Sequence, residues 1–296
     1  MISHRPTAVL LLALLTLRAA PADASDPVWF YRAESPRGAI TYLYPSDHLN
    51  DARVRRPPEW IVDQRSKLVL EVTTDQLEAN TEMAMSYILS PTPVELHAYF
   101  TESEIDTIRA RLTCHGVAQM IEQLRLSFIS IFISFPCPNS SDEPYTYEEL
   151  LELRAKTHGI EVVGLESPDE QLTALASLPD RVAIESIKEY VGDPAHVDEL
   201  DERMIAAYNA GKYDDLYRMT MDEGPKNPDD KKLFWDKIVI ERNRHMVERL
   251  GAILEQGNAL VVIGAAHFPG PDGIVDLLRR QNYKVTEIDV SSGNLP

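Results

Sequence analysis

Basic residues are scarce in this chain, with 29 lysines and arginines against 47 aspartates and glutamates and a net charge of −18. A surface with this excess of negative charge repels nucleic acids and anionic membranes, which excludes binding to either through phosphate contacts. Two interpretations of the acidic surface remain, a contribution to solubility and a preference for cationic partners.

Cysteine is also sparse, and the chain contains only Cys114 and Cys137. Neither belongs to a CxxC pair, which disfavours a cysteine-ligated metal site or a redox motif. In an exported protein the two residues predict a single disulfide bond, which would contribute about 3 kcal/mol to stability.

Several common catalytic signatures are missing. The sequence has no HExxH helix, no GxSxG turn, no phosphate-binding P-loop and no GxGxxG after an apolar strand. These absences argue against the zincins, the α/β-hydrolases, the P-loop nucleotidases and the dinucleotide-binding enzymes.

No apolar run reaches the length of a transmembrane helix. Arg5, the apolar run 8–17 and the Ala22-Asp23-Ala24 sequence have the pattern of a secretory signal peptide. We therefore expect residues 1–24 to be a signal peptide, residues 25–296 to be the mature domain, and the protein to be exported to the periplasm or secreted. The most apolar interior run, 126–135, is predicted to be a buried helix or strand without an integral membrane segment.

The remaining pattern predicts a single domain, because no linker, repeat or low-complexity run divides it. Apolar strands are expected at 28–32, 39–44, 67–72, 161–164 and 259–263. Helices are expected at 59–66, 105–112, 117–128, 147–158 and 274–280, with long helices filling 180–257. Strands at both ends of the chain and a largely helical middle indicate an α/β (mixed α+β) fold with a mixed central sheet.

Three polar residues, His48, Glu71 and His267, lie at or just beyond the ends of predicted apolar strands. In open α/β sheets the carboxyl edge is where ligands and catalytic groups gather. Each residue also has a purely structural interpretation: a loop histidine is often only hydrogen-bonded, and Glu71 can pair with a core arginine such as Arg242.

Three segments resemble the TraB/GumN family, which also contains the Tiki metalloproteases. The first is the strand ending in Gly264-Ala-Ala-His267, followed by a glycine-punctuated turn and a Leu-Leu helix. The others are Gly164-Leu-Glu166 and the Arg242-Asn243 helix. The resemblance runs from about residue 40 to residue 285. The family's glycine before Tyr283 is replaced by Asn282, which tolerates a left-handed capping conformation.

The resemblance implies divalent-metal-dependent peptide hydrolysis. His48 and His267 would hold Mn²⁺, Co²⁺ or Zn²⁺, and Glu71 would be a further ligand or the general base for the attacking water. Asp47, Glu166, Arg242 and Asn243 would hold these ligands in place by hydrogen bonds and charge from behind.

The first histidine motif departs from the family pattern, because Pro45-Ser46-Asp47-His48 replaces Gly-Thr-x-His. Proline restricts the backbone there, whereas Asp47 adds an acceptor beside His48. The main alternative is therefore a non-catalytic binding or accessory protein of the envelope with an eroded metal site. A third possibility is hydrolysis of a non-peptide ester or amide.

Overall fold

The computed structural model of the chain describes residues 28–48, 51, 53–135, 137, 145–290 and 295. Its described strands form a six-stranded mixed sheet in the order β4-β3-β5-β2-β1-β6. The strand bounds are β1 Trp29–Glu34, β2 Ile40–Ser46, β3 Lys67–Leu70, β4 Glu161–Gly164, β5 Ala259–Gly264 and β6 Lys284–Asp289. The predicted signal peptide lies outside the described residues.

Strand direction divides the sheet into two parts. β1 pairs antiparallel with β2 and with β6, whereas β2, β5, β3 and β4 are paired in parallel. The N-terminal hairpin and the C-terminal strands are therefore neighbours, as the sequence predicts. The parallel part brings four strand ends to one edge of the sheet.

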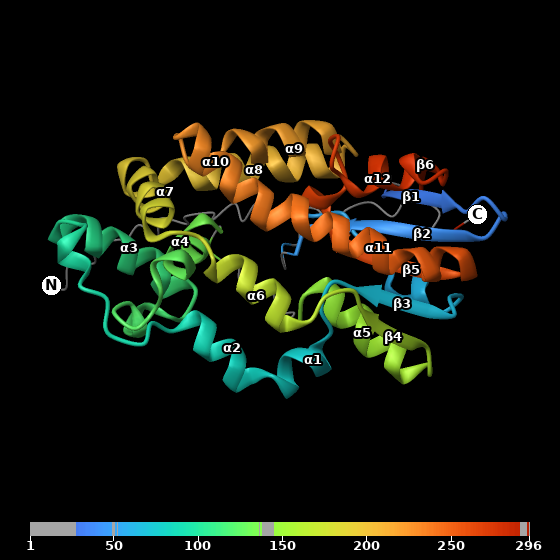
Figure 1. The fold of residues 1–296 in the computed structure, drawn as a ribbon, viewed down its shortest axis with the longest axis horizontal. Coiled ribbons are helices and arrows are strands. Elements are labelled where there is room, and N and C mark those ends of the chain that lie inside the picture. Colours follow the sequence, from blue (N-terminus) through green and yellow to red (C-terminus); the bar gives the residue numbers. More distant parts are fainter. Residues whose placement is uncertain are drawn as a thin grey trace, which may run out of the picture.

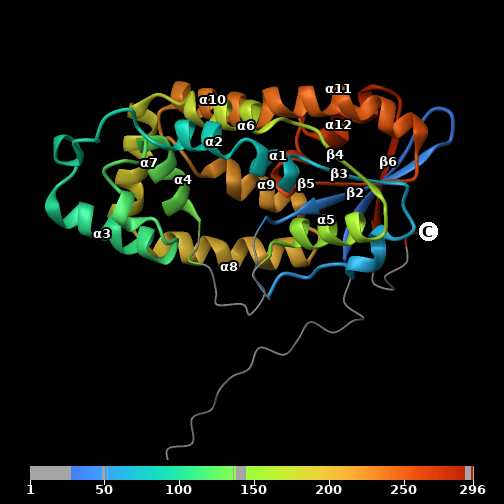
Figure 2. The same cartoon turned by 90° about the horizontal axis from the view of Figure 1, so that it is seen from below.

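Helices cover both faces of the sheet, which explains why the central strands are apolar along their whole length. In β3, Val69 belongs to one core cluster, whereas Leu68 and Leu70 belong to the other. The first face is covered by α8 (Ala195–Asn209), α9 (Tyr213–Asp222), α11 (Glu241–Gln256) and α12 (Ile274–Arg280). The opposite face is covered by α5 (Tyr147–Thr157) and the short 3-10 helix η1 (Glu59–Val62), and Figure 2 shows the sheet lying between α11 and α5. Side chains that alternate between two buried faces give the continuous apolar runs seen in the sequence.

A helical module lies at the end of the molecule opposite the sheet (Figure 1). Its core cluster is supplied mainly by α3 (Glu102–Cys114), α4 (Leu126–Ser134) and α7 (Asp180–Gly192). The predicted disulfide between Cys114 and Cys137 is present in this module, with 5.5 Å between the two Cα atoms. The remaining α-helices among the described residues are α1 (Thr74–Ala79), α2 (Thr81–Ile88), α6 (Pro168–Ala176) and α10 (Pro228–Trp235). A π-helical turn spans Asp236–Ile240, and short 3-10 turns lie at Leu96–Ala98, Ala118–Met120 and Ala265–His267.

Two predicted helices differ from the structure. The expected helix 117–128 is wrong: Ala118–Met120 is a single 3-10 turn, and α4 begins at Leu126. The helix is interrupted because the backbone around Leu124 pairs with the segment after α2, with Ser90 N–H donating to Gln123 O and Arg125 N–H donating to Ile88 O. The expected helix 59–66 is only the four-residue turn η1.

Several helices begin at a capping residue. Thr101 and Ser167 each cap a helix within a capping box, and Asn282 has the left-handed backbone (φ 68°) expected at that position. None of the helices in the described part of the chain has the length and apolar character needed to cross a membrane.

Candidate functional site

The carboxyl ends of the four parallel strands each lead into a polar side chain at one edge of the sheet. His48 follows β2, Glu71 follows β3, Glu166 follows β4 and His267 follows β5. Parallel strands end at the same edge, so residues that are far apart in sequence become neighbours there. Glu71 and Glu166 are buried, and Glu166 N–H donates to the carbonyl oxygen of Glu71 at 2.8 Å.

His48 is held from two sides. Its Nε2 lies 3.2 Å from Oε1 of Glu71, and its Nδ1 lies 2.7 Å from Oε1 of Glu148 in the first turn of α5. Its backbone is left-handed (φ 55°), a conformation that costs a non-glycine residue about 1–2 kcal/mol. Ser46 Oγ stabilises this turn by accepting from the His48 N–H at 3.2 Å, and the same hydroxyl donates to Glu148. The ring is 48% exposed, so it is the part of the cluster that solvent reaches.

The two carboxylates also set the charge of His48. Desolvation acts to lower the pKa of the imidazole, but the hydrogen bonds with Glu148 and Glu71 outweigh it and raise the pKa well above 6.5. Burial acts to raise the pKa of Glu148, and the hydrogen bond from His48 lowers it below its ordinary value. In the protein without a metal, both carboxylates therefore favour the protonated ring over the neutral one.

Pro45 does not remove His48 from the site. Pro45 lies within β2 opposite Ile263 of β5, whereas the pairing of β2 with β1 ends at Leu43. The missing N–H therefore breaks no ladder hydrogen bond on the β1 side. The Pro45 carbonyl accepts from the hydroxyl of Tyr208 at 2.6 Å, which anchors the strand end from α8.

Glu71 uses both carboxylate oxygens. Oε1 accepts from the N–H of Gly264 at 2.7 Å, and Oε2 accepts from Arg242 at 2.5 Å and from Gln171 at 3.3 Å. Burial acts to raise the pKa of Glu71, but the hydrogen bond from His48 and the charges of His267, His48 and Arg242 hold it well below its usual range. Glu71 is thus ionised at neutral pH.

Arg242 links two strand ends. Its Nη2 donates to Oε2 of Glu166 at 2.6 Å and its Nε to Oε1 of Glu166 at 3.0 Å, beside the contact with Glu71. Burial acts to lower the pKa of this guanidinium, but the two carboxylates outweigh it and raise the pKa above its ordinary value. Arg242 therefore forms the core ion pair that the structural interpretation of Glu71 anticipates, and it includes Glu166 as well.

His267 is buried in a 3-10 turn, and its tautomer follows from Asn243. The Asn243 Nδ2 donates to the carbonyl oxygens of His267 at 3.2 Å and Asp272 at 2.8 Å, which fixes the amide orientation. Its Oδ1 then faces Nδ1 of His267 at 2.6 Å, so Nδ1 carries the proton and Nε2 keeps its lone pair. Burial lowers the pKa of His267 to about 4, which keeps the ring neutral at pH 7, and its charged form would interact with Glu71 and His48.

Gly264 is required by close approach. A Cβ atom at this position would lie 2.4 Å from Nε2 of His48 and 3.2 Å from Oε1 of Glu71. Its φ of −53° is open to any residue, so the constraint comes from space. The glycine of the Gly-x-x-His sequence thus lets the imidazole and the carboxylate meet above the strand end.

Two site residues were not predicted from the sequence. Glu148 belongs to a helix N-terminus whose only signal is the capping box of Thr146 and Glu149, and Gln171 lies in the next helix turn after the Ser167 cap. Asp47, expected beside the ring of His48, pairs with Arg56 at 3.4 Å, and the acceptor at Nδ1 is Glu148.

The donor chemistry suits a divalent cation, since two imidazoles and an ionised carboxylate lie at one edge, each imidazole with an acceptor at Nδ1. The residues that the structure describes nevertheless contain no group of three or more His, Cys, Asp or Glu side chains arranged to hold a metal ion. Glu71 and His48 instead pair with each other and with Arg242 and Glu148.

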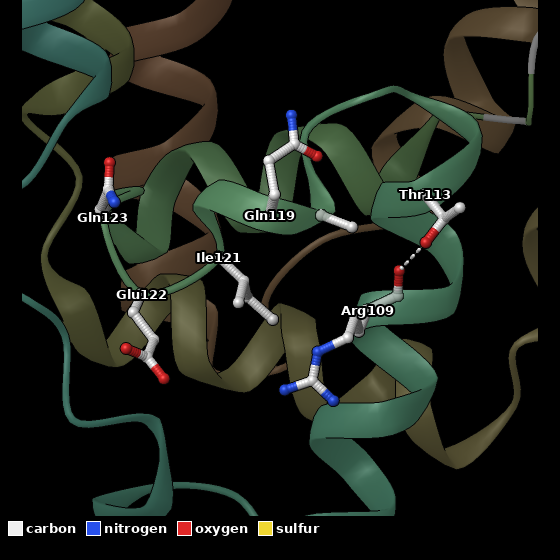
Figure 3. Close-up of a pocket in the computed structure, with 7 residues that line it drawn as sticks. Arg109, Thr113, Gln119, Ile121, Glu122 and Gln123 are labelled. Carbon is white, nitrogen blue, oxygen red and sulfur yellow. Dashed lines mark hydrogen bonds between the residues drawn. The ribbon is translucent and has the colours of Figure 1, made fainter.

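A cavity of about 530 Å³ lies elsewhere, in the helical module. Figure 3 shows its lining, where the Thr113 hydroxyl donates to the Arg109 carbonyl and Arg109 and Glu122 are the charged side chains. It contains none of the residues at the sheet edge, so it is separate from the site described above.

Comparison with known proteins agrees with the landmarks at the sheet edge. The profile of the TraB/PrgY/gumN family matches residues 29–287. The match includes β1 to β5 in full and most of β6. No curated protein and no solved structure gives a significant match. A profile match over most of the chain shows the family, and the chain therefore belongs to the TraB/PrgY/gumN family.

Proposed function

We propose that the chain is an exported, metal-dependent hydrolase that cleaves peptide bonds, with Mn²⁺, Co²⁺ or Zn²⁺ held by His48, Glu71 and His267. One observation carries the proposal. At one sheet edge, each of two imidazoles has Nδ1 against an acceptor, which directs Nε2 to the ligand role, and an ionised carboxylate lies 3.2 Å from the Nε2 of His48. Metal-ligating histidines characteristically have such a partner at the second ring nitrogen.

The residues of the chain have distinct tasks in this proposal. The half-exposed His48 faces solvent and marks the side from which a substrate approaches. Arg242 and the Gly264 N–H fix Glu71 in its ionised form, ready to bind the metal or to accept a proton from water. Asn243 holds His267 as the neutral Nδ1–H tautomer. The metal itself would supply a bound water whose pKa is lowered toward neutrality.

The substrate class and the compartment come from other arguments. Peptide cleavage is what the resemblance to the metalloprotease branch implies, and a water-activating site of this kind would also hydrolyse a non-peptide ester or amide. Export is supported by the signal-like pattern of residues 1–24 and by the disulfide between Cys114 and Cys137.

A second candidate is a binding or accessory protein of the envelope without catalytic activity. It is favoured by the saturation of the cluster, because Glu71 already accepts from Gly264, Arg242 and Gln171. In this alternative the clamp on His48 is a structural ion pair. The geometry at Nδ1 of both histidines favours the hydrolase over this alternative.

Peptide turnover by the mature protein tests the choice. The protein would be purified without chelators and assayed on a mixed peptide library with Mn²⁺, Co²⁺ or Zn²⁺, and again after EDTA. His48→Ala and His267→Ala should each abolish metal-dependent cleavage, whereas His245→Ala, an exposed histidine on α11, should leave it unchanged. If no metal supports turnover of peptides, or if both site variants cleave as well as the wild type, the peptidase proposal fails. Turnover of ester or amide substrates alone would indicate the non-peptide hydrolase.

A further inference from the structure

Among the polar residues at the sheet edge, Glu148 is the least expected from the sequence, because it comes from a helix on the face opposite α11. It lies in the first turn of α5, where the helix dipole favours a carboxylate. The capping box of that helix uses Thr146 and Glu149, so the side chain of Glu148 is not needed to cap the helix. It extends to the strand end of β2 and accepts from His48 Nδ1 at 2.7 Å.

The position of Glu148 is itself fixed by Ser46. The Ser46 hydroxyl oxygen accepts from the backbone N–H of His48, which leaves the hydroxyl proton for Oε1 of Glu148. Serine, glutamate and histidine thus form a closed ring of hydrogen bonds. This ring holds both the backbone and the imidazole of His48, and it accounts for a left-handed residue that would otherwise be strained.

The two sides of the imidazole are not equivalent. The contact of Nδ1 with Glu148 is 2.7 Å, whereas the contact of Nε2 with Glu71 is 3.2 Å, and the Glu71 oxygen involved already accepts from the Gly264 N–H at 2.7 Å. The shorter contact identifies Nδ1 as the nitrogen that retains its proton. Asn243 does the same for His267 from α11, so two unrelated helices impose one arrangement on both histidines.

We propose that Glu148 is a positioning residue: by accepting from Nδ1 it fixes the rotation of the His48 ring and holds Nε2 toward Glu71 and the site. Its effect on metal affinity rests on the proposed function, whereas its effect on the ring does not. A carboxylate behind a ligating histidine is worth about 10–100-fold in metal affinity.

The test uses ¹⁵N-labelled, metal-free mature protein and follows the ring N–H signals of His48, assigned by their loss in His48→Ala. We expect the wild type to show a downfield Nδ1–H signal protected from exchange. Glu148→Ala should lose it, and Ser46→Ala should weaken its protection. Glu148→Gln keeps an acceptor oxygen and should retain the signal. Glu149→Gln, which removes the neighbouring charge but can still cap, is the matched control and should resemble the wild type.

Zn²⁺ alone is then titrated against a chromophoric chelator. Glu148→Ala should bind about 10–100-fold more weakly than the wild type, and Glu148→Gln should recover most of the loss. An unchanged Nδ1–H signal in Glu148→Ala, or a variant that only lowers Tm while the ring signal and Zn²⁺ affinity stay the same, would overturn the proposal. If the wild type binds no Zn²⁺, the proposed metal function fails, and the ring signals alone decide the role of Glu148. Glu148→Gln and Ser46→Ala keep the test valid if Glu148→Ala does not fold.

Discussion

At the scale of single residues, the arrangement at the sheet edge depends on close contacts between a few side chains. Gly264 has no side chain where His48 and Glu71 meet, and Arg242 lies between two buried carboxylates. Glycine is thus required by space, and arginine is required by charge. Both requirements lead to direct tests.

Gly264→Ala should displace the ring of His48 while the fold remains, because alanine adopts the backbone of Gly264 without strain but its Cβ would lie 2.4 Å from Nε2. We expect Zn²⁺ affinity to fall by about tenfold or more, as when a ligand loses its orientation. Gly251→Ala is the control, since a Cβ there meets nothing within 4 Å and alanine favours the helix by up to about 1 kcal/mol. Equal Zn²⁺ affinity in both variants, measured by chelator competition, would contradict this account.

Arg242→Met should destabilise the protein by about 3–5 kcal/mol, because it leaves Glu71 and Glu166 as buried charges without their cation. Urea unfolding measures the change. The double variant Arg242→Met/Glu166→Gln should recover part of the loss. Arg244→Met removes an exposed pair with Asp272 from the same helix and should cost less than about 1 kcal/mol. A loss at Arg242 no larger than that at Arg244 would refute the buried-ion-pair description.

Residue roles were predictable only in part. The strand ends at His48, Glu71 and His267 can be recognised from apolar runs, and the pairing of Glu71 with Arg242 was one of the interpretations left open. Glu148 could not be predicted, because its role depends on where α5 packs against the sheet, and no local pattern encodes that.

At the scale of elements, the four parallel strands present their carboxyl ends together, and the helices that follow attach to one another by exposed charge pairs and by the disulfide. α6 is joined to α11 by the ion pair of Glu170 with Arg249. The disulfide joins Cys114, the last residue of α3, to Cys137, which follows α4. These links are local, so their loss should affect stability more than the site.

Replacing both cysteines, Cys114→Ser/Cys137→Ser, should lower the free energy of unfolding by about 3 kcal/mol, since the bond closes a loop with a sequence separation of 23. Guanidinium unfolding measures the effect. The ring signals of His48 should stay the same, because the cysteines contact Arg111 whereas the imidazole is held by Glu71 and Glu148. A large change in those signals would show that the module and the site are coupled.

Glu170→Gln should weaken the link between α6 and α11 in a pH-dependent way. Hydrogen bonds from Arg249 and from the Ser167 N–H lower the pKa of Glu170 from 4.5 to about 2, so the folded state binds fewer protons than the unfolded state between these values. The stabilisation is therefore present above pH 4.5 and is lost as the pH falls toward 2. Because both groups are partly exposed, we expect a difference of about 1 kcal/mol or less at pH 7.

Urea unfolding of the Glu170→Gln variant and the wild type at pH 7 and pH 3.5 checks this expectation. The difference in unfolding free energy should be smaller at the lower pH. A constant difference would contradict the expectation that the ionised Glu170 carboxylate stabilises the fold through Arg249 and the Ser167 N–H.

Helices and strands were predicted correctly where the local sequence pattern alone determines the structure. β4 and α12 have the predicted bounds. The prediction failed at 117–128, because backbone pairing around Leu124 with the end of α2 overrides the helical pattern. A long-range contact of this kind has no signature within a local window.

At the scale of the whole molecule, the sheet that carries the polar edge lies beside a helical module with its own core (Figure 1). The mixed α/β architecture was predictable, because strands at both ends of the chain must pair to bury their apolar faces. The strand order was not predictable, because the insertion of β5 between β3 and β2 follows from the crossovers and not from composition. That insertion places the end of β5, with Gly264, between the ends of β3 and β2.

We propose that this edge holds a divalent metal, and metal content tests the proposal most directly. Mature protein purified without chelators and loaded with Mn²⁺, Co²⁺ or Zn²⁺ would be analysed by elemental mass spectrometry, together with His48→Ala and His267→Ala. Our account predicts near-stoichiometric metal in the wild type and its loss in both variants. A folded protein that stays free of metal after loading, and whose variants do not differ from it, would contradict the account and leave the binding protein as the better description.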